Sequence, residues 1–226
     1  GIGRAVAEAF VLGGWRVLAL SRSGDVPPGV VHRPTDLLEP GWAPSLEAWL
    51  RDSPLVAGEG PCRICLVHNA AVHLKDSAVA IDVAGLQRSF ELNVLVPAAL
   101  NKLLFPRMGP GSSILYIGST LSEKAVKNTA SYVTTKHALA GLMKCTCQDL
   151  AGTQVHTALL CPGFTATEML LDHVGRDPEA EALVLSMQTM GRLIEPKEIA
   201  AAVRFCAENP VVNGSVFHVN LGQVER

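Results

Sequence analysis

The chain has 226 residues, of which 48% are hydrophobic and 18% charged, and its formal net charge at pH 7 is −2. This length fits one large domain, and the mixed charges exclude both the basic stripe of a nucleic-acid-binding protein and a disordered acidic tail. No apolar run reaches the length of a membrane span, and the first residues lack the regions of a signal peptide. We therefore expect a cytoplasmic protein with no membrane span.

Strand-like apolar runs alternate with amphipathic stretches of helical length along the chain. The predicted strands are residues 15–20, 29–33, 63–71, 113–119, 155–163 and 215–220, and the predicted helices are residues 4–12, 43–51, 83–104, 131–150 and a stretch after Pro196. This alternation is typical of a parallel sheet with helices on both faces. With no repeat and no dividing linker, we predict that residues 1–226 form a single α/β domain, a Rossmann-like doubly wound sheet in three α/β/α layers.

The beginning of the chain, "GIGRAVAEAF", looks like the end of a phosphate-binding turn. In a doubly wound sheet, glycines after the first strand let the backbone approach a pyrophosphate, which the N-terminus of the next helix attracts. Gly1 and Gly3 would form the end of that turn, and residues 4–12 its helix. Glycines near helix starts are common, so this motif alone is weak.

Tyr132 and Lys136 lie four residues apart on a predicted helix and therefore on one face of it. A tyrosine has a usual pKa of about 10, and a nearby ammonium stabilises the phenolate and lowers that pKa, which suits proton exchange with a substrate oxygen. Ser119 ends a predicted strand at the edge where such sheets bind ligands. Asn93 is an amide inside a predicted helix and needs hydrogen-bond partners. The alternative is an ordinary amphipathic helix.

Residues 164–195 form a long insertion between a predicted strand and a predicted helix, and we predict that this segment is a substrate lid. It is rich in leucine and methionine. An apolar pocket is one interpretation, and helix core is the alternative for half of its apolar side chains. These side chains are Met169, Leu170, Leu171, Val174, Leu183, Leu185, Met187 and Met190.

The six cysteines have no framework of the kind found in small secreted domains. Cys62 and Cys65 form a CxxC, but no second CxxC or histidine pair completes four ligands, so we predict no metal site. We expect buried free thiols instead.

In its order and spacing of motifs, the sequence resembles the short-chain dehydrogenase/reductase family from Gly1 to Gly222. The matching features are the GIG end of the family's TGxxxGIG loop, "HNAA" (68–71) for NNAG, Asn93, the spacing of Ser119, Tyr132 and Lys136, "PGFTAT" (162–167) and "GRLIEPKEIAAAVRF" (191–205). Each motif is modest, but together they are specific.

The resemblance implies an oxidoreductase that transfers a hydride between nicotinamide and a carbonyl or secondary alcohol. Tyr132 would be the acid-base residue, Ser119 would position the substrate oxygen, Lys136 would bind the nicotinamide ribose, and Asn93 would hold a relay water. The resemblance also implies a set of cofactor-binding positions. These are Gly1, Ile2, Gly3, Ser21, Arg22, Asp36, Leu37, Asn69, Ala70, Ala71, Tyr132, Lys136, Pro162, Gly163, Thr165 and Thr167.

The residues at the end of the predicted strand 15–20, which corresponds to the second strand of the family, favour NADP(H) over NAD(H). Relatives that use NAD place an acid there, which binds the ribose 2′-hydroxyl and repels a 2′-phosphate. This chain has Ser21 at that position and Arg22 after it, and a hydroxyl with a guanidinium suits a phosphate. The alternatives are that Arg22 is a solvated surface charge and that Asp25 serves NAD.

Several positions depart from the family pattern. His68 replaces an asparagine and is expected to be a satisfied interior histidine, Ala71 replaces a glycine, and "VNLGQ" stands where many relatives have VDGG. The first strand and the TGxxx half of the loop do not appear before Gly1. Because that strand would be central in the sheet, we expect about ten or more further residues before Gly1 in the native protein.

A small or lipophilic free carbonyl compound is the preferred substrate. "CQDLAGTQ", after the Tyr132 helix, has no basic residue of the kind that receives an acidic carrier protein. The alternatives are an enzyme similar to 3-oxoacyl-carrier-protein reductases and a non-catalytic NADPH-binding or scaffold protein. The resemblance also implies a homodimer or homotetramer, formed through the helices near 83–104 and 131–150.

Overall fold

The computed structural model describes residues 1–53, 55, 60–174 and 177–224. Its strands are β1 (Val17–Ser21), β2 (Val30–Pro34), β3 (Cys65–His68), β4 (Ser113–Ile117), β5 (His156–Pro162) and β6 (Ser215–Val219). Its α-helices are α1 (Ile2–Leu12), α2 (Trp42–Asp52), α3 (Val83–Phe90), α4 (Val96–Leu104), α5 (Ala130–Asp149), α6 (Glu168–Val174), α7 (Pro178–Ser186) and α8 (Pro196–Glu208). The predicted order of elements is confirmed.

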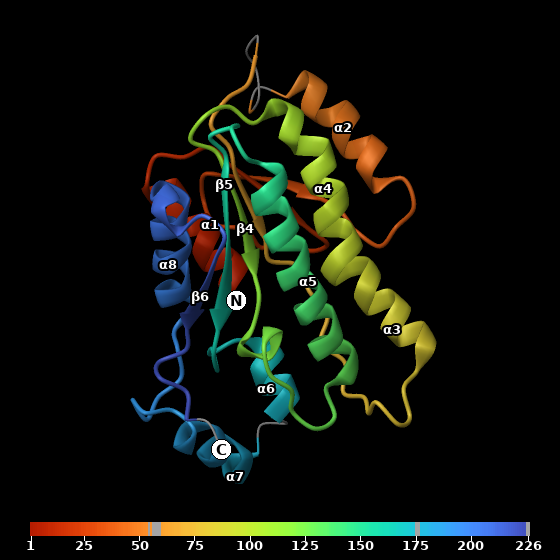
Figure 1. The fold of residues 1–226 in the computed structure, drawn as a ribbon, viewed down its shortest axis with the longest axis vertical. Coiled ribbons are helices and arrows are strands. Elements are labelled where there is room, and N and C mark those ends of the chain that lie inside the picture. The colour runs from red at the N-terminus through yellow and green to blue at the C-terminus, as the bar shows by residue number, and fades with distance from the viewer. Residues whose placement is uncertain (54, 56–59, 175–176, 225–226) are drawn as a thin grey trace.

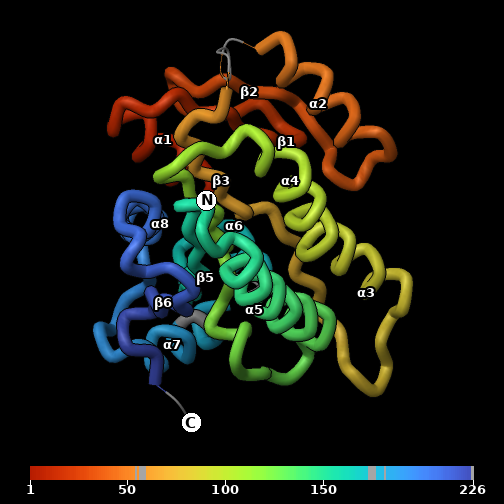
Figure 2. Tube along the Cα trace, turned by 45° about the horizontal axis from the view of Figure 1, so that its top comes forward, coloured from red at the N-terminus to blue at the C-terminus, as the bar shows by residue number. Residues whose placement is uncertain are grey.

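Among the described residues, all strand pairs are parallel, and they form two sheets. One contains β1 and β2, and the other has the order β3-β4-β5-β6. Within the described residues, β1 and β3 each pair on one side only, and all five residues of β1 are half-buried. Figure 2 shows the β1–β2 pair apart from the strands beneath it. The central first strand expected from the family resemblance would lie between β1 and β3, and it stays a prediction.

The helices cover both faces of the four-stranded sheet (Figure 1). Alternate residues of β4 point to opposite faces, as the two-residue period of a strand requires. Leu115 and Ile117 pack with α1 and α8, whereas Ile114 and Tyr116 pack with α5. A third apolar cluster joins α2 and α4 to Leu18 and Leu20 of β1. The three-layer α/β/α architecture is therefore confirmed, and no described helix is long and apolar enough to cross a membrane.

His68 is a satisfied interior histidine, as predicted. Its Nε2 lies 2.8 Å from Asn101 Oδ1, and its ring lies 4.7 Å from the ring of Tyr116. Asn101 Nδ2 donates to the Tyr116 hydroxyl, which contacts Thr146 Oγ1 at 2.9 Å. Burial lowers the pKa of His68 to about 4, so the ring is neutral at pH 7. This network ties β3 and β4 to α4 and α5.

The expectation of buried thiols is only partly correct. All six cysteines are free, and Cys161 and Cys206 are buried in the two main clusters. Cys145 is exposed, because it lies on the outer face of α5. The other three cysteines are partly buried.

Candidate functional site

Ser119 follows β4 and begins a short 3₁₀-helix, Thr120–Ser122. Its Oγ accepts a hydrogen bond of 3.1 Å from the N–H of Leu121, and its own N–H donates to Ser122 Oγ at 3.2 Å. This reciprocal capping holds the serine at the carboxyl edge of the sheet. Its hydroxyl also hydrogen-bonds the side chain of Tyr132.

Tyr132 and Lys136 lie on the buried face of α5, with 9% and 3% of their surfaces exposed. Lys136 Nζ lies 5.4 Å from the centre of the Tyr132 ring and donates to the carbonyl of Ile117 at 2.8 Å. The structure therefore brings Ser119, Tyr132 and Lys136 together. An ammonium has three N–H donors, and among the described residues Lys136 donates to this carbonyl alone, so donors remain for ligand oxygens.

The expectation that Lys136 lowers the pKa of Tyr132 is wrong for this structure. Burial raises the pKa of Tyr132 to about 12, although the hydrogen bond with Ser119 acts in the opposite direction. Burial also lowers the pKa of Lys136 to about 8. Desolvation disfavours the charged form of each group and is the largest cause of both shifts. Tyr132 is consequently a neutral phenol at pH 7, which suits it to donate a proton.

Asn93 lies in one turn of π-helix, Glu91–Leu95, between α3 and α4. Its Oδ1 accepts the N–H of Val72 at 2.9 Å, while its Nδ2 donates to the carbonyl of Val72 and to Thr135 Oγ1, each at 3.0 Å. The buried amide thus joins the loop after β3 to α5, within one residue of Lys136. Such π-turns are frequent at functional sites. The role of Asn93 in holding a relay water stays a prediction.

Two site residues, Asp76 and His73, were missed from the sequence. Asp76 Oδ1 accepts the N–H of Ser131 at 3.0 Å, and its Oδ2 accepts the Ser131 hydroxyl, so it caps α5 from another loop. The His73 ring lies 4.2 Å from the Tyr132 ring. No local spacing indicates either contact, because both depend on how the loop after β3 packs on α5.

Gly1 caps the N-terminus of α1 and Gly3 lies in its first turn, so the structure begins the helix two residues before the predicted 4–12, and Gly3 lies beside the loop after β3. A Cβ built on Gly3 would lie 2.6 Å from Asn69 Nδ2, so a larger residue here would require the Asn69 side chain to move. A Cβ on Gly1 would lie 3.9 Å from Thr167 Cγ2. Gly1, Gly3, Asn69 and Thr167 therefore gather at the N-terminus of α1. This close backbone approach and the buried amine of Lys136 fit a dinucleotide.

The remaining predicted cofactor residues lie along the same edge of the strands. Pro162 ends β5, and Thr165 Oγ1 donates to the carbonyl of Gly163 at 3.0 Å. Ala70 and Ala71 follow β3, whereas Ile2 and Leu37 turn their side chains into the core and offer only backbone. Asp36 Oδ1 accepts the N–H of Leu38 at 3.0 Å, which stabilises the turn after β2.

Ser21 ends β1, and Arg22 beside it is exposed. Within the described part of the chain, Arg22 makes no hydrogen bond or ion pair. Asp25, the alternative ribose ligand, instead pairs with Arg4 Nη1 at 2.5 Å, and its side chain is 89% exposed. The guanidinium of Arg22 is therefore open to a ligand, whereas the carboxylate of Asp25 is already paired with Arg4.

The lid region is anchored to the strand edge and carries α6 and α7. Ile194 donates its N–H to the carbonyl of Phe164 and accepts the N–H of Ala166, each at 2.9 Å. Of the eight apolar side chains considered for a pocket, four are exposed and do not enclose one, while the side chain of Val174 lies outside the described structure. The exposed four are Met169, Leu171, Leu183 and Met190.

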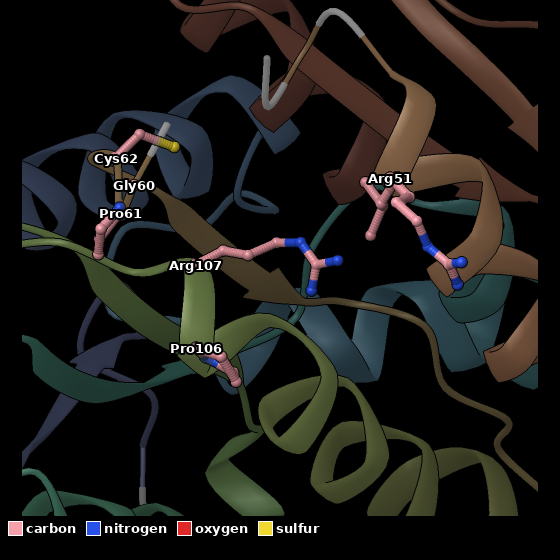
Figure 3. Close-up of a pocket in the computed structure, with 7 residues that line it drawn as sticks. Arg51, Gly60, Pro61, Cys62, Pro106 and Arg107 are labelled. Atoms are coloured by element: carbon pink, nitrogen blue, oxygen red, sulfur yellow. The ribbon is translucent and has the colours of Figure 1, made fainter. Parts of the chain in front are cut away.

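A cavity of about 320 Å³ lies at the opposite edge of the sheet (Figure 3). Cys62 lies before β3 and Arg107 before β4, whereas Ser119 lies after β4. The Arg107 side chain extends toward Arg51 across this space. The cavity is therefore separate from the cluster around Tyr132.

Comparisons with known proteins agree with this geometry. A family model described as enoyl-(acyl carrier protein) reductase matches residues 64–223. D-Erythrulose reductase of Gallus gallus is 28% identical over 215 residues, which cover 91% of this chain and 83% of that protein. NADPH-dependent aldehyde reductase 2, chloroplastic, of Arabidopsis thaliana is 29% identical over 206 residues, covering 86% and 71%.

A solved structure shares the same fold. Ligand-free aldohexose dehydrogenase of Thermoplasma acidophilum superposes with a TM-score of 0.86 and 27% identity, over 98% of this chain and 89% of that one. The family model covers most of the chain, and the relatives match nearly all of it. The chain therefore belongs to the short-chain dehydrogenase/reductase family, whose members are oxidoreductases that act on CH–OH and C=O groups with a nicotinamide cofactor.

Proposed function

We propose that the protein is an NADP-dependent oxidoreductase that interconverts a free carbonyl compound and its alcohol. The observation that carries the proposal is the buried cluster of Ser119, Tyr132 and Lys136 at the carboxyl edge of the sheet. NADPH, when bound, supplies the hydride that the carbonyl carbon takes up. The nucleotide would lie along Gly1, Gly3, Asn69 and Thr167.

In the reductive direction, Tyr132 acts as the acid. Its raised pKa keeps the phenol protonated at pH 7, so its hydroxyl can give a proton to the substrate oxygen. The Ser119 hydroxyl, already on Tyr132, orients that oxygen. The amine of Lys136 lies 5.4 Å from the centre of the Tyr132 ring, so its positive charge would offset part of the cost of the phenolate left behind, although burial has the larger effect on the pKa of Tyr132. In alcohol oxidation the same groups act in reverse, and Tyr132 takes the proton.

The preference for NADPH is supported by Ser21 and Arg22 and by the pairing of Asp25 with Arg4. One relative is named as an NADPH-dependent aldehyde reductase. Two others are named for sugar substrates, an erythrulose and an aldohexose. These names extend the proposed substrates to small hydroxylated aldehydes and ketones, for which the open apolar side chains of the lid are not essential.

The test is NADPH oxidation at 340 nm with three substrate groups: free ketoses and aldehydes, lipophilic ketones, and acyl-carrier thioesters. Turnover of free carbonyl compounds supports the proposal. Turnover of thioesters alone would replace it with a carrier-dependent reductase. Binding of NADPH without turnover of any group would favour the scaffold alternative.

A further inference from the structure

Ser21 and His32 are joined at the carboxyl edge of the β1–β2 sheet. Ser21 is the last residue of β1, and His32 lies in β2 opposite Ala19. His32 Nε2 lies 2.9 Å from Ser21 Oγ and 3.2 Å from the carbonyl oxygen of Ser21. The imidazole therefore reaches along the sheet to the residue proposed to meet the cofactor ribose.

The contacts of Nε2 determine the direction of this hydrogen bond. A carbonyl oxygen only accepts, so the tautomer with the proton on Nε2 is the one that suits both contacts. The Ser21 hydroxyl then accepts from the imidazole, and its own hydrogen points away from His32, toward the carbonyl of Ser23 at 2.9 Å. His32 thus makes Ser21 a donor toward any ligand that replaces the Ser23 carbonyl.

The loop that follows β1 holds the imidazole in place. A Cβ built on Gly24 would lie 3.5 Å from His32 Nδ1, so this loop packs on the ring at ordinary contact distance. Arg22, in the same loop, adds a second donor with a positive charge. Asp25, the acid of the loop, is paired with Arg4. The loop therefore presents hydrogen-bond donors to a ligand, while its carboxylate, Asp25, is paired with Arg4.

We propose that His32 is a positioning residue for the 2′-phosphate of NADPH, acting through Ser21. An ionised phosphate has oxygens that only accept hydrogen bonds, so a hydroxyl held as a donor beside Arg22 is matched to it. The 2′-hydroxyl of NADH carries no charge and would gain less binding free energy from Ser21 and Arg22. This inference rests on the proposed function and adds His32 to the residues that determine cofactor choice.

The experiment compares wild type, His32→Leu and His32→Gln by fluorescence titration with NADPH and NADH. His32→Leu should weaken NADPH binding about fivefold, the value of one hydrogen bond, and change NADH binding less than twofold. His32→Gln keeps an N–H near the Nε2 position and should restore NADPH binding to within about twofold of wild type. In the free protein, ¹⁵N NMR should find the proton of His32 on Nε2.

Equal losses for both cofactors, or no rescue by glutamine, would overturn the proposal and leave His32 a structural residue. A His32 ring with its proton on Nδ1 alone would also overturn it, and this readout needs no variant. If wild type binds NADPH no better than NADH, the proposed NADP preference itself fails. If wild type prefers NADPH and His32→Leu keeps that preference, only the role of His32 fails.

Discussion

Asp76 and Ser131 are joined by two hydrogen bonds, although 55 residues separate them in the sequence. The carboxylate accepts both the backbone N–H and the hydroxyl of Ser131, one residue before Tyr132. The N-cap of α5, Thr129, makes no side-chain cap of its own. Asp76 therefore supplies the negative cap that the N-terminus of this helix needs.

Removal of this cap should affect both stability and activity. Asp76→Ala should lower the free energy of unfolding by about 1 kcal/mol, the usual value of a lost cap, and should also lower kcat because Tyr132 loses its fixed position. Asp82→Ala is the matched control, since Asp82 caps α3 through the N–H groups of Ala84 and Gly85. It should cost similar stability with little change in kcat. Urea unfolding measures the stability of the two variants, and turnover measures their kcat. Equal kcat in the two variants would contradict the positioning role.

Two glycines should respond oppositely to alanine. Gly3→Ala places a methyl group 2.6 Å from Asn69 Nδ2 and should weaken both NADPH binding and stability. Gly141 lies within α5 with open space around its missing Cβ, so Gly141→Ala should raise stability by about 0.5–1 kcal/mol. Thermal unfolding and cofactor titration check both. A Gly3→Ala variant that binds NADPH like wild type would disprove the close approach.

The buried amine of Lys136 should make stability depend on pH. Its pKa is about 8 in the folded protein and 10.5 in its usual environment, so between these values the unfolded chain binds more protons. The free energy of unfolding should therefore rise with pH across this window, by about 3 kcal/mol relative to Lys136→Met. The raised pKa of Tyr132 is present in both proteins and largely cancels. A constant difference from pH 7 to pH 10.5 would show that the amine is not desolvated.

Arg22 should contribute to cofactor choice through its charge. Arg22→Gln should weaken NADPH binding about tenfold and leave NADH binding nearly unchanged, because a charged hydrogen bond to phosphate is lost. Arg51→Gln, at the other edge of the sheet, controls for net charge. Titrations at two salt concentrations distinguish a direct contact from a long-range effect. Equal losses in the two variants would contradict the assignment.

Much of the fold follows from local sequence patterns. The continuous apolar run of β4 and the amphipathic pattern of α8 predict these two elements, and the predicted strand 113–119 ends two residues after the observed Ser113–Ile117. The π-turn at Glu91–Leu95 was not predicted, because one extra residue hardly changes the apolar pattern of a helix. Asn93 was the available signal there, since a buried amide inside a helix needs partners that a regular turn does not supply.

The grouping of Ser119, Tyr132 and Lys136 could be predicted from the sequence, whereas the residues around it could not. Tyr132 and Lys136 are neighbours by helical spacing, and Ser119 follows from the end of a strand. Asp76 and His32 reach the site through loop packing and strand register, which no local pattern encodes. The pKa of Tyr132 depends on the balance of burial against charge, and that balance requires distances.

The most direct test of the proposed chemistry is Tyr132→Phe, which removes the hydroxyl and keeps the ring. We expect NADPH affinity and thermal stability close to those of wild type, and kcat for a free carbonyl substrate lower by at least about 100-fold, the value of a lost acid-base group. Full turnover by Tyr132→Phe, with cofactor binding intact, would show that another group moves the proton and would contradict the account.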